Sequence, residues 1–186
     1  MRIEILLSGE GGQGLILAGV MLGEAAVLYE GVNATQNQSY GIQARGGECR
    51  SEVIISDEEI NYAEIEQPDV LLAMSQSALN AYGGKIKENG VVIVDAGLVE
   101  DLSSVKNTGN IFRLPITEIS LEKTKKVVLA NVVALGVLSA LTGVVSKKSL
   151  ERVILKRAPA GTEELNLLAL SSGVLAAEKF GKDTKN

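Results

Sequence analysis

The sequence predicts an α/β protein with three layers, in which helices cover both faces of a mostly parallel or mixed sheet. Short apolar and β-branched runs alternate with helical segments, and the last third of the chain carries helical patterns only. The first apolar run leads into a glycine-rich loop and a helix, which is the Rossmann-like opening of such folds. With 186 residues, the chain has the length of one domain, since a domain holds about 150 residues.

Composition excludes several classes of protein. Hydrophobic residues make up 46% of the chain and the formal net charge is −5, which argues against disorder. No dense basic patch is present, so binding of nucleic acid is not expected. The chain contains no histidine and one cysteine, Cys49. It therefore cannot form a Ser-His-Asp triad or hold an iron–sulfur cluster alone, and any redox cofactor must be held by another protein. A single cysteine fits a reducing cytoplasm.

The N-terminal elements follow from local patterns. Arg2–Leu7 predicts a buried first strand, and Ser8–Gly14 (SGEGGQG) predicts a glycine loop. Leu15–Tyr29 is rich in leucine, alanine and small residues without proline, which predicts a helix that packs close to the sheet.

The next segment, Gly31–Gly47, is polar and almost uncharged, with three glutamines and two asparagines. We expect a short strand near Val32, followed by an ordered loop that packs on a neighbouring subunit, because such a composition suits a hydrated interface. Glu48–Ser56 alternates between polar and apolar residues and predicts a strand that can run antiparallel. Asp57–Gln67 predicts a turn with a short extended piece.

Strands and helices alternate in the rest of the chain. Continuous apolar runs predict two buried strands, and Pro115 closes a third strand at an edge. The predicted strands are Pro68–Met74, Val91–Asp95 and Asn110–Ile116, and the predicted helices are Ser75–Ala81, Ala130–Thr142, Lys147–Lys156 and Thr162–Phe180.

One segment has the length of a membrane span. Val127–Val145 contains 19 residues without a charge. It also contains Asn131, Ser139 and Thr142, and lysines flank both of its ends. These features predict a buried core helix rather than a span.

The glycine loop matches the pattern G-x-G-x-x-G between a strand and a helix. Without Cβ atoms, its amides can approach a phosphate, which the start of the helix also attracts. NAD-binding proteins carry an acid about 20 residues further on, but that zone holds only uncharged residues such as Asn33 and Gln36. NAD is therefore disfavoured, and a tight turn that needs glycine is the alternative. The candidate ligand residues are Gly9, Gly11, Gly12, Gln13 and Gly14.

Two further candidates lie elsewhere. Arg45, beside Gly46, either binds an anion or a partner's carboxylate, or forms an internal salt bridge. Asn131 interrupts an apolar helix and must find hydrogen-bond partners, so it either bonds to a loop or faces a site.

Asp95 and Cys49 have simpler explanations. Asp95 ends a buried strand, where it either contacts a ligand or caps the turn at Gly97. Cys49 is either a reactive thiol or a small buried hydrophobic residue, and the lack of a neighbouring histidine favours the second reading.

Taken together, these motifs resemble those of the gamma subunits of 2-oxoacid:ferredoxin oxidoreductases. The resemblance lies in SGEGGQG at Ser8–Gly14, QSYGIQARGG at Gln38–Gly47 and IISDEEINY at Ile54–Tyr62, and extends over nearly the whole chain. Glu164 and Asn166 also resemble a late Glu-x-Asn motif of this family. It is strongest to the 2-oxoglutarate synthase type, although pyruvate, 2-oxoisovalerate and indolepyruvate enzymes share these motifs. The family often has Pro-Glu where this chain has Ile42-Gln43.

The resemblance implies a complex that converts a 2-oxoacid and CoA into an acyl-CoA and CO2 while reducing ferredoxin. The thiamine diphosphate sites then belong to alpha and beta partners, and the iron–sulfur clusters belong either to beta or to a ferredoxin-like delta partner. This chain, as one domain over residues 1–186, contributes to CoA placement and assembly. We expect the amides of Gly11–Gly14 to face a CoA phosphate, with Arg45 as the nearby cation. Two alternatives stay open, an independent nucleotide-dependent enzyme and a purely structural subunit.

Overall fold

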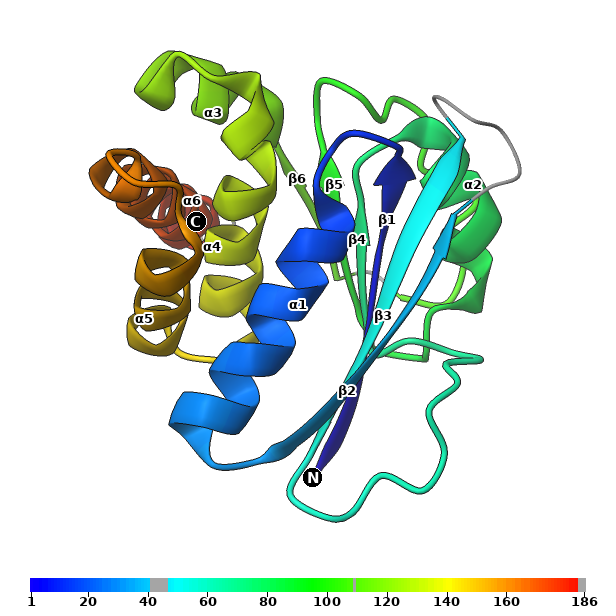
Figure 1. The fold of residues 1–186 in the computed structure, drawn as a ribbon. Coiled ribbons are helices and arrows are strands. Elements are labelled where there is room, and N and C mark those ends of the chain that lie inside the picture. Colours follow the sequence, from blue (N-terminus) through cyan, green and yellow to red (C-terminus); the bar gives the residue numbers. More distant parts are fainter. Residues whose placement is uncertain (41–46, 109, 184–186) are drawn as a thin grey trace.

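The computed structural model describes residues 1–40, 47–108 and 110–183, which form one six-stranded sheet with α-helices on both faces (Figure 1). The strands are β1 (Arg2–Glu10), β2 (Asn33–Tyr40), β3 (Glu48–Ser56), β4 (Val70–Ala73), β5 (Val91–Asp95) and β6 (Ile111–Leu114). The helices are α1 (Leu15–Ala25), α2 (Gln76–Tyr82), α3 (Ile116–Thr124), α4 (Ala130–Thr142), α5 (Lys147–Arg157) and α6 (Glu163–Asp183), and a π-helical turn, Ala26–Glu30, extends α1.

The sheet is mixed, with the strand order β2-β3-β1-β4-β5-β6. The pairs β1–β4, β4–β5 and β5–β6 are parallel, whereas β1–β3 and β3–β2 are antiparallel. The three-layer class and the antiparallel pairing of β3 are therefore confirmed. The parallel half carries the continuous apolar strands, as expected for strands buried on both faces.

Alternating side chains of the central strands divide between two cores. Ile5 and Leu7 of β1 face the larger core under α1, α4, α5 and α6, whereas Leu6 faces a smaller core under α2. Figure 1 shows these helices on opposite sides of the sheet. The sheet thus has one thickly covered face and one thinly covered face.

Helix α4 forms the centre of the larger core. Every residue from Ala130 to Ser139 is buried. It crosses α6 at Gly136 and Gly173, where a Cβ atom would lie 2.2 Å from the carbonyl oxygen of Leu170 and 2.0 Å from that of Val133. The two helices therefore touch backbone to backbone. The prediction of a buried core helix is confirmed, and within the described ranges no helix is long and apolar enough to span a membrane.

Over Asn33–Tyr40 the prediction of a loop is wrong, because these eight residues form β2. Residues 41–46 of the predicted loop lie outside the described residues. Its polar side chains have partners on both faces of the sheet. The amide of Gln36 donates to Ser51 Oγ at 2.8 Å, and that of Asn37 donates to the carbonyl of Ala63 at 2.8 Å. The prediction of strands relied on the alternation of apolar and polar residues. An edge strand with polar side chains on both faces lacks this alternation, so β2 was missed.

Helix α3 was not predicted. Its buried positions are Ile116, Ser120 and Thr124, which recur every four residues as a helix requires. Two of the three are small and polar, so the helical face has no apolar signal. The hydroxyl groups of Ser120 and Thr124 donate to the carbonyl of Lys126 instead, at 2.6 and 3.1 Å.

Candidate functional site

The glycine loop connects β1 with α1 by a tight turn. The amide of Gln13 donates to the carbonyl of Glu10 at 3.3 Å, and that of Gly11 donates to the carbonyl of Gly47 at 3.0 Å. In the described part of the chain, the amides of Gly12 and Gly14 donate to no carbonyl. Both residues have positive φ, 98° and 74°. Two of the four expected amides are thus available to a ligand at the start of α1.

The side chain of Gln13 braces this loop. Its Oε1 accepts a hydrogen bond from the amide of Glu10 at 2.8 Å, and its Nε2 donates to the carbonyl of Met74 at 2.8 Å. A Cβ atom on Gly9 would lie 2.1 Å from the same Oε1. Gly9 therefore makes room for Gln13, and Gln13 ties the loop to the end of β4.

Asn131 joins the glycine loop to the core helix, 117 residues further along the chain. Its Nδ2 donates to the carbonyl of Gly14 at 3.1 Å, and its Oδ1 accepts from the amide of Val132 at 2.9 Å. A Cβ atom on Gly14 would lie 2.6 Å from Nδ2. Asn131 therefore bonds to a loop and also lines the cavity beside it.

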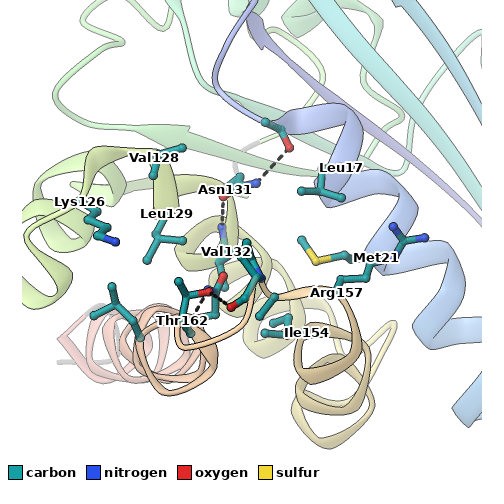
Figure 2. Close-up of a pocket in the computed structure, with 15 residues that line it drawn as sticks. Leu17, Met21, Lys126, Val128, Leu129, Asn131, Val132, Ile154, Arg157 and Thr162 are labelled. Carbon is teal, nitrogen blue, oxygen red and sulfur yellow. Dashed lines mark hydrogen bonds between the residues drawn. The ribbon is translucent and has the colours of Figure 1, made fainter.

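This cavity has a volume of about 340 Å³ and lies where α1, α4 and α6 begin and α5 ends (Figure 2). Its walls are mainly apolar, formed by residues such as Leu17, Val128 and Leu129. Lys126 and Arg157 stand at opposite ends of it in Figure 2, and no carboxylate is among its described lining residues. The cavity has the size of a small ligand pocket.

The two cations differ in their partners. Nε of Arg157 donates to Oε2 of Glu24 at 2.6 Å, and a second bond joins the same two side chains. The guanidinium holds the pKa of Glu24 below its usual value, chiefly through this hydrogen bond. Lys126 has no ion-pair partner among the described residues. With three helix N-termini nearby, the site favours a ligand that is anionic at one end and apolar at the other.

Sequence reasoning missed most of this cavity. Lys126 lies in the run Lys123–Lys126, whose charges are typical of a solvated surface, and nothing in the sequence distinguishes it from its neighbours. Asn166, which belongs to the late Glu-x-Asn motif shared with the gamma subunits, did signal the region. Its Nδ2 donates to the carbonyl of Thr162 at 2.9 Å and so closes the first turn of α6 beside the cavity.

Asp95 and Cys49 have structural roles. Asp95 is fully buried, and its carboxylate accepts from the amide of Gly97 at 2.9 Å and from that of Thr117 at 2.8 Å. The turn-capping interpretation is confirmed. Cys49 is 5% exposed, and burial raises the pKa of its thiol, which agrees with a small buried hydrophobic residue.

Arg45 and Gly46 lie outside the described residues, so their roles stay predictions. Among the residues that the structure does describe, no group of three or more histidine, cysteine, aspartate or glutamate side chains could hold a metal ion. The described site therefore offers main-chain donors, the amide side chains of Asn131 and Asn166, two cations and an apolar wall.

Comparison with known sequences identifies the class of protein that has this fold and this site. A family model described as pyruvate ferredoxin/flavodoxin oxidoreductase matches residues 4–176, and the chain belongs to this family. Among individual proteins, it is 50% identical over 180 residues to the 2-oxoglutarate synthase subunit KorC of Methanocaldococcus jannaschii. That alignment covers 97% of this chain and 96% of the relative.

Solved structures agree with this placement. The gamma subunit of a keto/oxoacid ferredoxin oxidoreductase from Geobacter sulfurreducens superposes with a TM-score of 0.87 and 44% identity, covering 96% of this chain and 98% of that one. A 2-oxoglutarate:ferredoxin oxidoreductase from Magnetococcus marinus, described with 2-oxoglutarate, coenzyme A and succinyl-CoA bound, shares the fold with a TM-score of 0.85 and 24% identity. That match covers 96% of this chain and 31% of the other. The resemblance to gamma subunits is confirmed.

Proposed function

We propose that this chain is the gamma subunit of a cytoplasmic 2-oxoglutarate:ferredoxin oxidoreductase. The complex would convert 2-oxoglutarate, CoA and oxidised ferredoxin into succinyl-CoA, CO2 and reduced ferredoxin. The observation that carries this proposal is the 50% identity to a 2-oxoglutarate synthase subunit along almost the full length of both chains. The chain, acting as one domain over residues 1–186, would be inactive alone, because alpha and beta partners would carry thiamine diphosphate and either beta or a delta partner would carry the iron–sulfur clusters.

The contribution of this chain to the reaction would be the placement of CoA. CoA combines phosphates with a long, largely uncharged pantetheine arm, and the site offers both kinds of contact. The amides of Gly12 and Gly14 and the ammonium of Lys126 suit a phosphate, whereas the apolar wall suits an uncharged segment. A cavity of about 340 Å³ is smaller than CoA, so it would hold one part of the molecule.

A purely structural role is the second candidate, because the side chains of two of the expected ligand residues have internal partners. Gln13 bonds to Glu10 and Met74, and Asn131 bonds to Gly14. If these bonds are the whole purpose of the motif, the glycine loop only closes a tight turn. The two candidates differ in whether the site contacts CoA.

The CoA-binding role and the structural role can be distinguished by measuring 2-oxoglutarate-dependent ferredoxin reduction with the purified complex. With Lys126→Ala, we expect the KM for CoA to rise about tenfold with little change in kcat, which corresponds to the loss of one charge-assisted contact. Lys123→Ala is the matched control, since Lys123 pairs with Glu122 away from the cavity. An unchanged KM for CoA in both Lys126→Ala and Arg45→Ala would favour the structural role.

The substrate and the need for partners are tested separately. The complex should prefer 2-oxoglutarate to pyruvate, 2-oxoisovalerate and indolepyruvate when their kcat/KM values are compared. The isolated chain should reduce no acceptor with any of these acids and CoA. Turnover by the isolated chain would contradict the assignment as a non-catalytic subunit.

A further inference from the structure

Strand β2 forms an open edge of the sheet. It is eight residues long, pairs only with β3 in the described part of the chain, and contains neither proline nor a charged residue. The opposite edge strand, β6, has four residues and is followed directly by Pro115. Proteins usually protect a long edge with charge, proline or a bulge, because its free amides and carbonyls attract another strand. The β2 edge lacks the first two of these protections.

On the α1 side, an apolar groove runs beside this edge. Val27 and Leu28 of the π-helical turn are 47% and 55% exposed. Together with Ala34 of β2, they contribute to the apolar part of a groove of about 350 Å³, which Glu24, Thr35 and Gln36 also line. A strand added beside β2 would place every second side chain on this side.

On the other side, an acidic loop, residues 57–67, follows the same strand. The side-chain amide of Asn33 donates to the carbonyl of Glu58 at 3.1 Å, and that of Asn37 donates to the carbonyl of Ala63 at 2.8 Å. The loop contains five acidic residues and no lysine or arginine. All five are exposed, namely Asp57, Glu58, Glu59, Glu64 and Glu66. Among the described residues, only Asp57 has an ion-pair partner, the amino group of Met1.

We infer that the β2 edge binds an extended segment of a different polypeptide, which adds a strand to the sheet and alternates apolar with basic side chains. Main-chain hydrogen bonds would hold such a strand, and its alternate side chains would give specificity. Apolar residues would lie on Val27 and Leu28, and lysine or arginine would face the acidic loop. A second copy of this chain fits poorly, because pairing two β2 edges brings two acidic loops together.

A synthetic peptide tests the inference on the full chain. The probe is a fluorescein-labelled ten-residue peptide that alternates valine and lysine, and its binding is followed by fluorescence anisotropy. We expect saturable binding that weakens at least tenfold when alternate peptide amides are N-methylated, because those amides can no longer donate to β2. A peptide that alternates valine and glutamate should not bind. Equal affinity of the N-methylated and unmodified peptides would overturn the inference.

Variants of the chain locate the contact. Replacing Glu58, Glu59, Glu64 and Glu66 together by glutamine should weaken the valine–lysine peptide about tenfold and reduce the salt dependence of binding. The matched control replaces four exposed acids elsewhere, Glu88, Glu100, Glu118 and Glu122, and should leave its affinity unchanged.

Hydrogen exchange provides an independent readout, because β2 amides should gain protection when the peptide binds. Protection confined to other strands would overturn the inference. So would a dimer of this chain that the peptide dissociates, since it would assign the edge to a second copy.

Discussion

Glycine serves opposite purposes in two regions of this molecule. In the glycine loop, a Cβ atom on Gly9 or Gly14 would meet side-chain atoms, Oε1 of Gln13 and Nδ2 of Asn131. At the crossing of α4 and α6, a Cβ atom on Gly136 or Gly173 would meet backbone carbonyls. A side chain can rotate away, whereas a helix backbone cannot. The glycine loop is therefore the more tolerant region, and the crossing of α4 and α6, which no glycine motif marks, makes the stricter steric demand.

The largest effect should come from the crossing. Gly173→Ala or Gly136→Ala must push α4 and α6 apart, and we expect a loss of about 3 kcal/mol or more in the free energy of unfolding. Urea denaturation of the chain measures it. A loss below about 1 kcal/mol would mean that the crossing can relax, and the contrast with the loop would fail.

The next effect should be that of Gly14→Ala, with a loss of about 2 kcal/mol. Its φ of 74° is unfavourable for alanine, and its Cβ atom also meets Asn131. Gly12→Ala separates these two causes, because its φ is 98° but, apart from its chain neighbours, no described residue has an atom within 4 Å of the added Cβ. If Asn131 contributes, Gly14→Ala should cost less in an Asn131→Ala background, which a double-mutant cycle measures.

A smaller effect is expected for Gln13→Ala. It removes one hydrogen bond to the amide of Glu10 and one to the carbonyl of Met74, for a loss of about 1–2 kcal/mol. Gln13→Glu keeps the acceptor for Glu10 but not the donor for Met74, so it tests the two bonds separately. Faster hydrogen exchange at the amide of Glu10 should accompany Gln13→Ala only. An unchanged exchange rate would show that Gln13 does not brace the loop.

The smallest effect, of opposite sign, is expected for Gly23→Ala within α1. The nearest atom to its added Cβ is the Cβ of Ala34 at 3.9 Å, which is an ordinary van der Waals contact. Alanine should therefore stabilise the helix by about 0.5–1 kcal/mol. Destabilisation, measured in the same urea series, would indicate that α1 lies closer to β2 than the structure places it.

Much of the fold was predictable because its signals are local. The apolar runs that became β4 and β5, and the alternation that became β3, each lie within one short segment of chain. Polar elements were harder to predict. Strand β2 and helix α3 bury or bond serine, threonine, asparagine and glutamine, and these residues give no periodic apolar signal. Their partners, such as Ala63 for Asn37, become visible only in the folded chain.

The site was predictable only in part, for a related reason. Gly14 and Asn131 were selected individually, but only the folded structure shows that they touch. Lys126 belongs to the site because the start of α4 packs beside the start of α1. This contact joins segments far apart in the sequence, so the residues around Lys126 do not predict it. The family motifs compensated for some of this loss, since they marked the glycine loop and Asn166 together.

The enclosure of α4 also affects how the protein is made. This helix is buried on every side from Ala130 to Ser139, and α6, which covers one of those sides, follows it in the chain. Until α6 has been synthesised, the side of α4 that α6 covers stays exposed, and exposed apolar surface makes an incomplete chain prone to aggregation. A polypeptide that ends before α6 would leave this apolar face of α4 exposed to solvent. We expect proteases to degrade such fragments before they can compete with the full chain for partner subunits.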